Sequence, residues 1–254
     1  MLILLPPSEG KSSPRRGKPL ALDGLSFPVL TDARRTAIDA LVDLCSTRPP
    51  AEAARTLGLG PTQTDLVEAD AALESAPTAR ADAVYTGVLY EALDLASLET
   101  AARRRATAWV AVTSCVFGLV RPGDRIPAYR LSPQVTLPAL GTVSAHWRRH
   151  LAPAVDEARG KGLVVDLRSG SYVPFWRPAS GDRGVVSVRV MHEQGGKRSV
   201  VSHFNKATKG RIVRALLQDG SSVGTAARFA EQLRDLGWVV EADGSRLDVV
   251  VTDL

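Results

Sequence analysis

Two segments of the chain are short, continuous runs of apolar residues, and each run ends in a loop of small polar residues. The first is "AWVAVTSCVFG", residues 108–118, and the second is "GLVVDLRSGSY", residues 162–172. A strand that is apolar at every position is typical of a sheet covered on both faces. A third apolar run, "LILL" at residues 2–5, leads into the polar turn "PPSEGK". These runs predict buried strands that end in polar loops.

The other segments follow helical or hairpin patterns. Residues 31–77 are predicted to form three helices, interrupted at "PP" (49–50) and at "LGLGP" (57–61), and further helices are expected over 141–159 and 205–220. Period-two alternation around Gly195-Gly196 and Asp243-Gly244 predicts two hairpins. Because the order is no regular strand-helix-strand progression, we predict a single α+β domain over 1–254, a mixed β-sheet with β-hairpins surrounded by helices.

Length and composition set limits on the class of protein. The chain has 254 residues, 44% hydrophobic and 23% charged, which is ordinary for one globular domain with a core. The apolar start is too short for a signal peptide, and no run approaches the roughly 18 apolar residues of a membrane span. A cytoplasmic protein without a membrane partner is therefore expected. The sequence does not indicate an oligomeric state.

The sequence does not fit the residue patterns of common zinc sites or of the nucleotide-binding P-loop. Cys45 and Cys115 lie far apart without zinc-ligand spacing, and His146 and His150 enclose "WRR", which lacks the glutamate of a zinc protease motif. The "EGKSS" turn is no phosphate-binding P-loop, because Leu5 occupies the place of its first glycine and Pro14 stops the helix that should follow. No metal and no cofactor are predicted.

Several polar segments occur in an order that resembles the peroxide stress protein YaaA family. The resemblance spans nearly the whole chain and is carried by "PPSEGK", "YTG" (85–87), "SCVFGLVRPGD" with "YR" (114–124, 129–130), the helix bearing Trp147, "DLRSGSY" and "NKATKGR". It implies a role in surviving hydrogen peroxide by limiting free intracellular iron indirectly, and binding to DNA through a helix-hairpin-helix element in the N-terminal half.

The helix-hairpin-helix element would be "LGLG", Leu57 to Gly60. Gly58 and Gly60 would let main-chain N–H groups approach a DNA phosphate closely. A plain turn between helices is the alternative, because Asp65, Glu68 and Asp70 would repel DNA.

A net charge of +5 permits binding to DNA or to another polyanion. Lys206, Lys209, Arg211 and Arg214 surround the predicted start of a helix, where the helix dipole adds to their charge. Lys206 and Lys209 are three residues apart and could share one face. We therefore predict both lysines as DNA phosphate contacts, with a solvated start of a helix as the alternative.

A second hypothesis is an enzyme, a lyase, hydrolase or transferase, acting on a small anionic or nucleobase-containing substrate. Polar residues from many strand ends usually converge on a pocket. The expected pocket residues are Lys11, Tyr85, Lys206 and Tyr172 for catalysis, and Ser8, Ser114, Arg121, Tyr129, Arg130, Ser169, Asn205, Lys209 and Arg211 for ligand binding. A desolvated Lys11 or Lys206 would act as base or nucleophile, Tyr85 or Tyr172 as proton donor, and Arg121 or Arg130 as anion holder.

The third hypothesis is a scaffold, in which the polar loops only tie the sheet together. The number of cations weighs against it, since burying several like charges without acids is costly.

Overall fold

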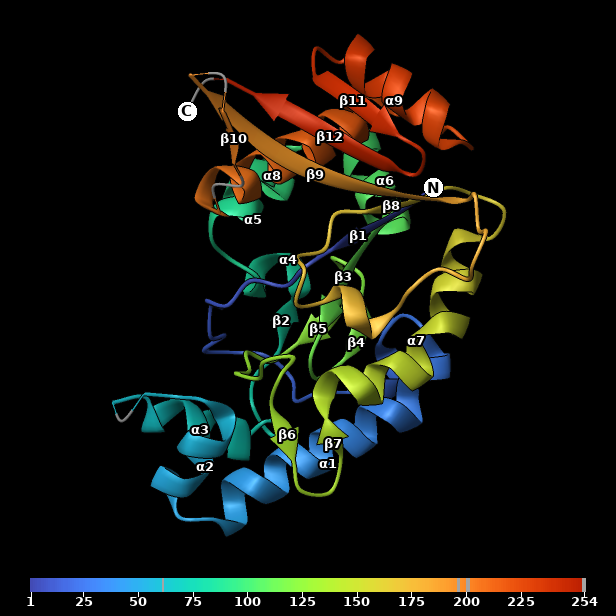
Figure 1. Ribbon diagram of the computed structural model, residues 1–254. Helices are drawn as coiled ribbons and strands as arrows, with labels where there is room; N and C mark the ends of the chain where they lie inside the picture. Colours follow the sequence, from blue (N-terminus) through green and yellow to red (C-terminus); the bar gives the residue numbers. More distant parts are fainter. Residues whose placement is uncertain (61, 196, 200–201, 253–254) are drawn as a thin grey trace.

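The computed structural model describes residues 1–60, 62–195, 197–199 and 202–252 (Figure 1). The described residues form an eight-stranded sheet in the order β11-β12-β9-β8-β1-β3-β4, with β10 paired to β9. The strands of this sheet are β1 Leu2–Leu5, β3 Val110–Ser114, β4 Gly118–Val120, β8 Val164–Asp166, β9 Val185–Gln194, β10 Lys197–Ser199, β11 Val239–Asp243 and β12 Arg246–Val251. Two small ladders join β2 Ala79–Arg80 to β5 Arg125–Ile126, and β6 Thr136–Leu137 to β7 Gly141–Thr142.

The middle of the sheet is parallel. β3, β1, β8, β9 and β12 run in one direction, whereas β4, β10 and β11 are antiparallel to their neighbours. Ile3 of β1 pairs with Val110 on one side and Val165 on the other. Every residue of β1 and β3 is buried, as expected for strands covered on both faces. The predicted α+β fold with a mixed sheet is confirmed.

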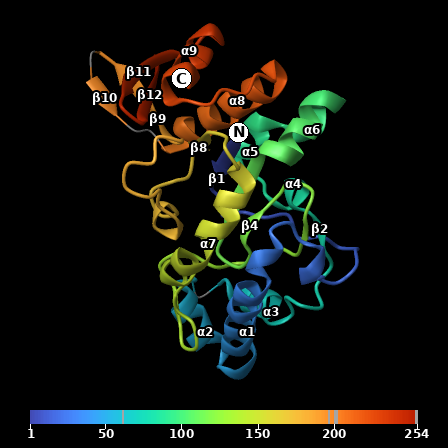
Figure 2. The same ribbon diagram turned by 90° about the vertical axis from the view of Figure 1, so that its right-hand side faces the viewer.

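Helices surround the sheet (Figures 1 and 2). The α-helices are α1 Thr31–Thr47, α2 Pro50–Leu57, α3 Thr64–Ala71, α4 Ala81–Val84, α5 Val88–Leu93, α6 Thr100–Trp109, α7 Val143–Arg159, α8 Ser202–Asp219 and α9 Ala226–Asp235. Short 3₁₀ turns are η1 Leu22–Gly24, η2 Pro28–Leu30, η3 Leu95–Ser97 and η4 Val173–Phe175. α6 packs against β1 and β3, α8 against β9 and α5, and α7 against β4.

The predicted local elements correspond to observed ones. The three helices expected over 31–77 are α1, α2 and α3, which lie at the end of the molecule away from β11 and β12 (Figure 1). The hairpin through Asp243-Gly244 joins β11 to β12, with Asp243 opposite Arg246. β9 and β10 form the other hairpin, and its turn residue Gly196 lies outside the described residues.

The order of the parallel strands places a crevice at one edge of the sheet. The chain leaving β1 moves toward β3 on one side, and the chain leaving β8 moves to β9 on the other side. Where neighbouring parallel strands send their connections in opposite directions, the loops separate and leave room for a ligand beyond the carboxyl ends of the strands. The polar loops "PPSEGK" and "LRSGSY" meet at this point.

Candidate anion-binding cleft

A cleft of about 1060 Å³ lies beyond the carboxyl ends of β1 and β8. Its walls come from segments far apart in the sequence: residues 6–11, 86–90, 130–134 and 168–173, parts of β9, and the first half of α8. This size fits a ligand at the upper end of the usual range for small-molecule sites. Most of the residues predicted for a pocket line it, namely Ser8, Lys11, Arg130, Ser169, Tyr172, Asn205, Lys206 and Lys209.

The turn after β1 has a fixed shape. The Ser8 hydroxyl donates to the Gly10 carbonyl oxygen at 2.6 Å and accepts the Thr86 N–H at 3.0 Å. Lys11 forms an isolated antiparallel bridge with Tyr85. Pro6 and Pro7 restrict the main chain before this turn. These contacts hold the Lys11 side chain beyond the carboxyl end of β1, where the sequence predicted it.

The Lys11 ammonium group lies over the ring of Tyr129, which is buried beneath the cleft. Its Nζ is 4.2 Å from the centre of the Tyr129 ring, and it donates to the Ser8 and Glu9 carbonyl oxygens at 2.9 and 3.4 Å. Burial lowers the pKa of Lys11 to about 8, and nearby Arg130 lowers it further, against the opposing effects of Cys115, Asp70 and Glu9. Near neutral pH an appreciable fraction of this amine is therefore uncharged.

Three predicted site residues form a buried relay below Lys11 instead of lining the cleft. The Tyr85 and Tyr129 hydroxyl oxygens are 3.1 Å apart, and the Tyr129 hydroxyl is 2.8 Å from the Ser114 Oγ. Ser114 also accepts the Phe117 N–H at 3.0 Å. Burial raises the pKa of both tyrosines, so the relay stays protonated. Tyr85 was predicted as a proton donor to a ligand, but its hydroxyl is enclosed and bonded within the protein.

The loop after β8 forms the opposite wall. Arg168 is buried and makes a two-pronged ion pair with Asp166, with Nη2 to Oδ2 at 2.7 Å and Nε to Oδ1 at 2.9 Å. It also donates to the carbonyl oxygens of Tyr172 at 3.1 Å and Trp176 at 2.8 Å. Arg168 therefore fixes the loop that carries Ser169 and Tyr172.

The α8 lysines differ from each other. Lys206 is exposed at the mouth of the cleft. Lys209 is 8% exposed and donates to the Leu167 carbonyl oxygen at 2.9 Å, so it ties α8 to the end of β8. Burial lowers the pKa of Lys209 to about 8. The prediction that both lysines share a face holds, but only Lys206 is free to approach a large partner.

Asp70 on α3 contacts the main chain of Arg130, a residue that lines the cleft. Its Oδ1 accepts the Arg130 N–H at 2.9 Å, while its buried Oδ2 has no hydrogen-bond partner among the described residues. Burial raises the pKa of this carboxyl group to about 7, against the opposing effects of the Arg130 N–H bond and the Lys11 charge. Asp70 is fully buried, so the expectation that it would repel DNA at the surface is wrong.

Arg121 was predicted to hold an anion in the pocket, and the structure places it at the other end of the sheet. β4 runs antiparallel to β3, so the residue after β4 returns to the amino end of β3. There Arg121 donates to the Val110 carbonyl oxygen at 3.0 Å and lies over the Phe27 ring. The antiparallel turn-back at Gly118 could not be distinguished from a parallel continuation in the sequence.

Arg211 also lies outside the cleft lining, on an exposed side of α8. Two residues along an α-helix correspond to a rotation of about 200°, so Arg211 points away from the direction of Lys209. Arg214, nearby on the same helix, donates to the Leu93 and Asp94 carbonyl oxygens at 3.0 and 2.8 Å and closes the end of α5.

The "LGLG" turn joins α2 and α3, as predicted for a helical hairpin, but its N–H groups are already used. The Gly58 N–H donates to the Arg55 carbonyl oxygen at 3.1 Å, and the Gly60 N–H donates to the Gln63 side chain at 3.0 Å. Gly58 adopts the left-handed conformation that ends α2, with φ of 69°. In this conformation neither glycine presents a free N–H to a phosphate. Pro61 lies outside the described residues.

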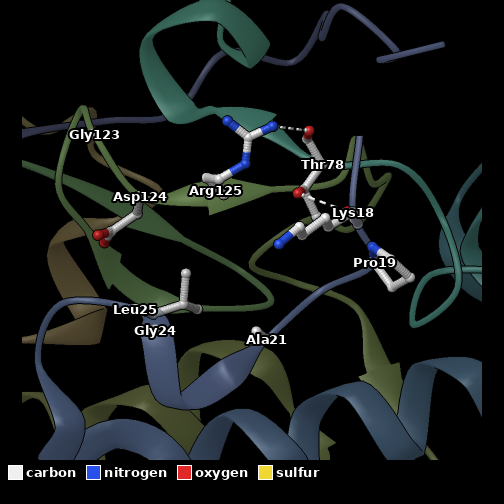
Figure 3. A pocket seen from close by; sticks show the side chains of 9 residues that line it. All are labelled: Lys18, Pro19, Ala21, Gly24, Leu25, Thr78, Gly123, Asp124 and Arg125. Atoms are coloured by element: carbon white, nitrogen blue, oxygen red, sulfur yellow. Dashed lines mark hydrogen bonds between the residues drawn. The ribbon is translucent and has the colours of Figure 1, made fainter. Parts of the chain in front are cut away.

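A second, smaller hollow of about 190 Å³ lies between the 18–25 and 123–125 segments (Figure 3). Two of its polar residues are engaged in hydrogen bonds: Arg125 donates to the Thr78 carbonyl oxygen at 2.7 Å, and Asp124 accepts the Ser26 hydroxyl at 2.7 Å. Because it is much smaller than the cleft and gathers fewer cationic side chains, this hollow is the weaker candidate.

Sequence reasoning missed two residues of the site. Arg168 stands inside the quoted "DLRSGSY" segment, and its position two residues after Asp166 was the available signal. Asp70 gave no signal, since one acidic residue in a helix is usually solvated.

Cys115 is fully buried beside the cleft, and burial raises the pKa of its thiol to about 12. Because the thiolate is the reactive form, Cys115 is poorly suited to reduce peroxide directly.

The part of the chain that the structure describes has no cluster of three or more His, Cys, Asp or Glu side chains placed to hold a metal ion. Among these described residues, no helix has the length and apolar character to cross a membrane.

Comparison with known proteins identifies the family. The chain is 48% identical to a UPF0246 protein of Streptomyces coelicolor, with the whole of both chains aligned. It is 41% identical to a UPF0246 protein of Corynebacterium efficiens over 98% of each chain, and 27% identical to an uncharacterized protein of Campylobacter jejuni over 84% of this chain and 83% of that protein. The family model described as peroxide stress protein YaaA matches residues 1–242. The chain belongs to the peroxide stress protein YaaA family, which supports a general role in oxidative stress.

Proposed function

We propose that the protein acts in the response to peroxide by binding a phosphate-bearing ligand of about nucleotide size in the cleft. The observation that carries this proposal is the excess of cations without acidic partners around the cleft. Lys11, Arg130, Lys206 and Lys209 make no ion pair with a described carboxylate. Buried or half-buried cations without a counter-charge are costly, and an anionic ligand would offset that cost.

The burial of two of the cleft's lysines favours a small ligand or a strand end over the side of a duplex. Lys209 is 8% exposed and Lys11 is half-buried, so a small ligand can approach them more closely than a phosphate in the backbone of a double helix can. Ser169 and Ser171, which also line the cleft, supply neutral donors, with their hydroxyl oxygens 3.3 Å apart. A ligand that combines phosphate with a polar ring would use both kinds of group.

DNA is the second candidate, and exposed positive charge on α8 favours it. Lys206 at the mouth of the cleft and Arg211 farther along the helix are both exposed. A strand lying along α8 would contact both residues, whereas a small ligand in the cleft would contact only Lys206.

Paired charge-removing variants separate the two candidates. Lys206→Gln and Arg211→Gln each remove one exposed charge from α8, and only Lys206 lines the cleft. Titration with a nucleoside monophosphate should show weaker binding, by about fivefold or more, for Lys206→Gln and no change for Arg211→Gln. A labelled oligonucleotide bound more weakly by both variants, with a salt slope reduced by about one for each, would favour DNA. Absence of saturable binding to either probe would contradict both candidates.

The finer physiological role, an indirect lowering of free intracellular iron during peroxide stress, is part of this proposal. Binding of a phosphate-bearing ligand or of DNA gives a route that requires no iron site in the protein. Metal analysis of purified protein should find far less than one iron per chain. About one tightly held iron per chain would show that iron is handled directly.

A further inference from the structure

Lys11 has the surroundings of a reactive amine instead of those of a salt-bridged lysine. Its Nζ donates to two main-chain carbonyl oxygens, at 2.9 and 3.4 Å, and stacks at 4.2 Å on the Tyr129 ring. The described part of the chain supplies no carboxylate within ion-pair distance of this nitrogen. Carbonyl oxygens and a ring face hold the amine in place without fixing a charged partner beside it.

The position of Lys11 gives this amine access to a ligand. The residue lines the cleft and is half-buried, so its nitrogen is both sheltered and reachable. Lys209 provides an internal comparison, because it also lines the cleft and also donates to two main-chain carbonyl oxygens, those of Leu167 at 2.9 Å and Arg168 at 3.4 Å. The two lysines differ in exposure: Lys209 is 8% exposed whereas Lys11 is half-buried, so Lys11 is the more accessible nucleophile.

Tyr172 supplies a proton donor at the same site. The Cys115 thiol donates to the Tyr172 hydroxyl oxygen at 3.6 Å, which leaves the proton of that hydroxyl available for another acceptor. Burial raises the pKa of Tyr172, so the hydroxyl remains protonated throughout the physiological range. Tyr172 lines the cleft together with Lys11.

We propose that Lys11 forms a reversible imine with an aldehyde or ketone group of an anionic ligand held in the cleft. The ligand class is thus a small phosphate-bearing carbonyl compound. This inference rests on the proposed function for the way the ligand is held, while the reactivity of the amine can be tested independently of it.

The reaction is balanced without an oxidant or a reductant. The lone pair of the neutral Nζ attacks the carbonyl carbon, a C–N bond forms, and the π electrons move to the oxygen, which takes a proton from Tyr172. Nζ loses a proton to restore the tyrosine. Tyr172 then donates a proton to the hydroxyl of the carbinolamine, the hydroxyl leaves as water, and the nitrogen lone pair forms the C=N bond. The iminium nitrogen loses its remaining proton to the Tyr172 oxygen, which restores the tyrosine. The net change is amine plus carbonyl giving imine plus water.

The charges around Lys11 determine the pH range. Arg130 favours the neutral amine, whereas Cys115, Asp70 and Glu9 favour the ammonium form, and burial outweighs them all to bring the pKa to about 8. An ordinary lysine has a pKa near 10.4, so Lys11 should carry a far larger neutral fraction at pH 7. Selective labelling at neutral pH is the expected consequence.

The experiment uses two aldehydes that differ by one phosphate group. The full chain is incubated at pH 7 with pyridoxal phosphate or with pyridoxal, borohydride fixes any imine as a stable amine, and peptide mapping locates the label. We expect Lys11 to be labelled at least about tenfold faster than the exposed Lys18 and Lys161. Pyridoxal phosphate should also label Lys11 faster than pyridoxal does. The Tyr172→Phe variant should slow labelling of Lys11 while leaving that of Lys161 unchanged.

The outcomes distinguish this inference from the proposed function. Preferential labelling of Lys11 at equal rates by both aldehydes would support imine formation and contradict phosphate recognition. Labelling that shows no preference for Lys11 would overturn the inference, even if a titration with nucleoside monophosphate shows binding in the cleft. The preference for Lys11 is measured on the wild-type chain, so a Tyr172→Phe variant that fails to fold would not affect that result.

Discussion

The cleft and the α2–α3 turn were both predicted to contact phosphate. The glycine N–H groups of the turn are bonded within the protein, whereas lysines of the cleft have no ion-pair partner among the described residues. At the turn, the Gly58 and Gly60 N–H groups donate to Arg55 and Gln63 within the same hairpin. In the cleft, Lys11 and Lys206 make no ion pair with a described carboxylate. A glycine-rich turn is a site for anions only when its N–H groups remain unpaired. Convergence of cations from distant segments is the stronger indication here.

Removing Asp166 tests the cleft wall and should produce the largest loss of stability. Asp166→Ala leaves the buried Arg168 guanidinium without its two-pronged partner. Breaking a buried ion pair from one side costs about 3–5 kcal/mol, so the free energy of unfolding in urea should fall by about 3 kcal/mol or more. Ligand binding should weaken as well, because Arg168 positions the loop of Ser169 and Tyr172.

An exposed ion pair provides the control for that variant. Asp248→Ala removes the partner of Arg189, an arginine whose side chain is 49% exposed, and a longer contact of 3.7 Å with the exposed Arg246, and should cost less than about 1 kcal/mol. Equal losses for Asp166→Ala and Asp248→Ala would show that the Asp166–Arg168 pair does not hold the cleft wall.

Asp70 connects the two regions, since it belongs to α3 and lies beside Arg130 and Lys11. Burial raises its pKa from 3.8 to about 7, so the folded state favours the neutral carboxyl. This contribution to stability is fully present below pH 4 and is lost as the pH rises through about 7. Asp70→Asn keeps an acceptor for the Arg130 N–H and removes the charge. Its stability relative to wild type should therefore rise by up to about 4 kcal/mol between pH 4 and pH 8.

Urea unfolding of both proteins at several pH values measures this difference. Lys11 titrates in both proteins, so the comparison cancels most of its contribution and leaves that of Asp70 together with the coupling between the two groups. If the difference in unfolding free energy between the two proteins stays constant from pH 4 to pH 8, Asp70 titrates normally and is not desolvated by the packing of α3. Loss of the Asp70 charge should also move the pH midpoint of Lys11 labelling to a lower value, because that charge favours the ammonium form.

The sequence allowed much of the fold to be predicted, because apolar runs and turn residues are local signals. The run of Leu2–Leu5 identified a central strand, and Asp243-Gly244 identified a hairpin. The cleft could be predicted in part, since Lys11 and Tyr172 follow strands that proved to be parallel neighbours. Arg121 was misplaced because the direction of β4 depends on tertiary pairing. Asp70 was wrongly predicted as an acidic residue that would repel DNA, because its burial depends on how α3 packs.

The smallest expected effect concerns the α2–α3 turn itself. Gly58→Ala places a side chain at φ of 69°, where no other atom lies within 4 Å of the new Cβ, so only main-chain strain of about 1 kcal/mol is expected. Gly24→Ala is the matched control, because Gly24 has similar open space and lacks a positive φ, and it should change stability by less than about 0.5 kcal/mol. If the turn only joins two helices, the affinity of Gly58→Ala for an oligonucleotide and for a nucleoside monophosphate should equal that of wild type. A selective loss of oligonucleotide binding would instead assign a DNA contact to the hairpin, and would mean that the Gly58 and Gly60 N–H groups leave their present partners when DNA binds.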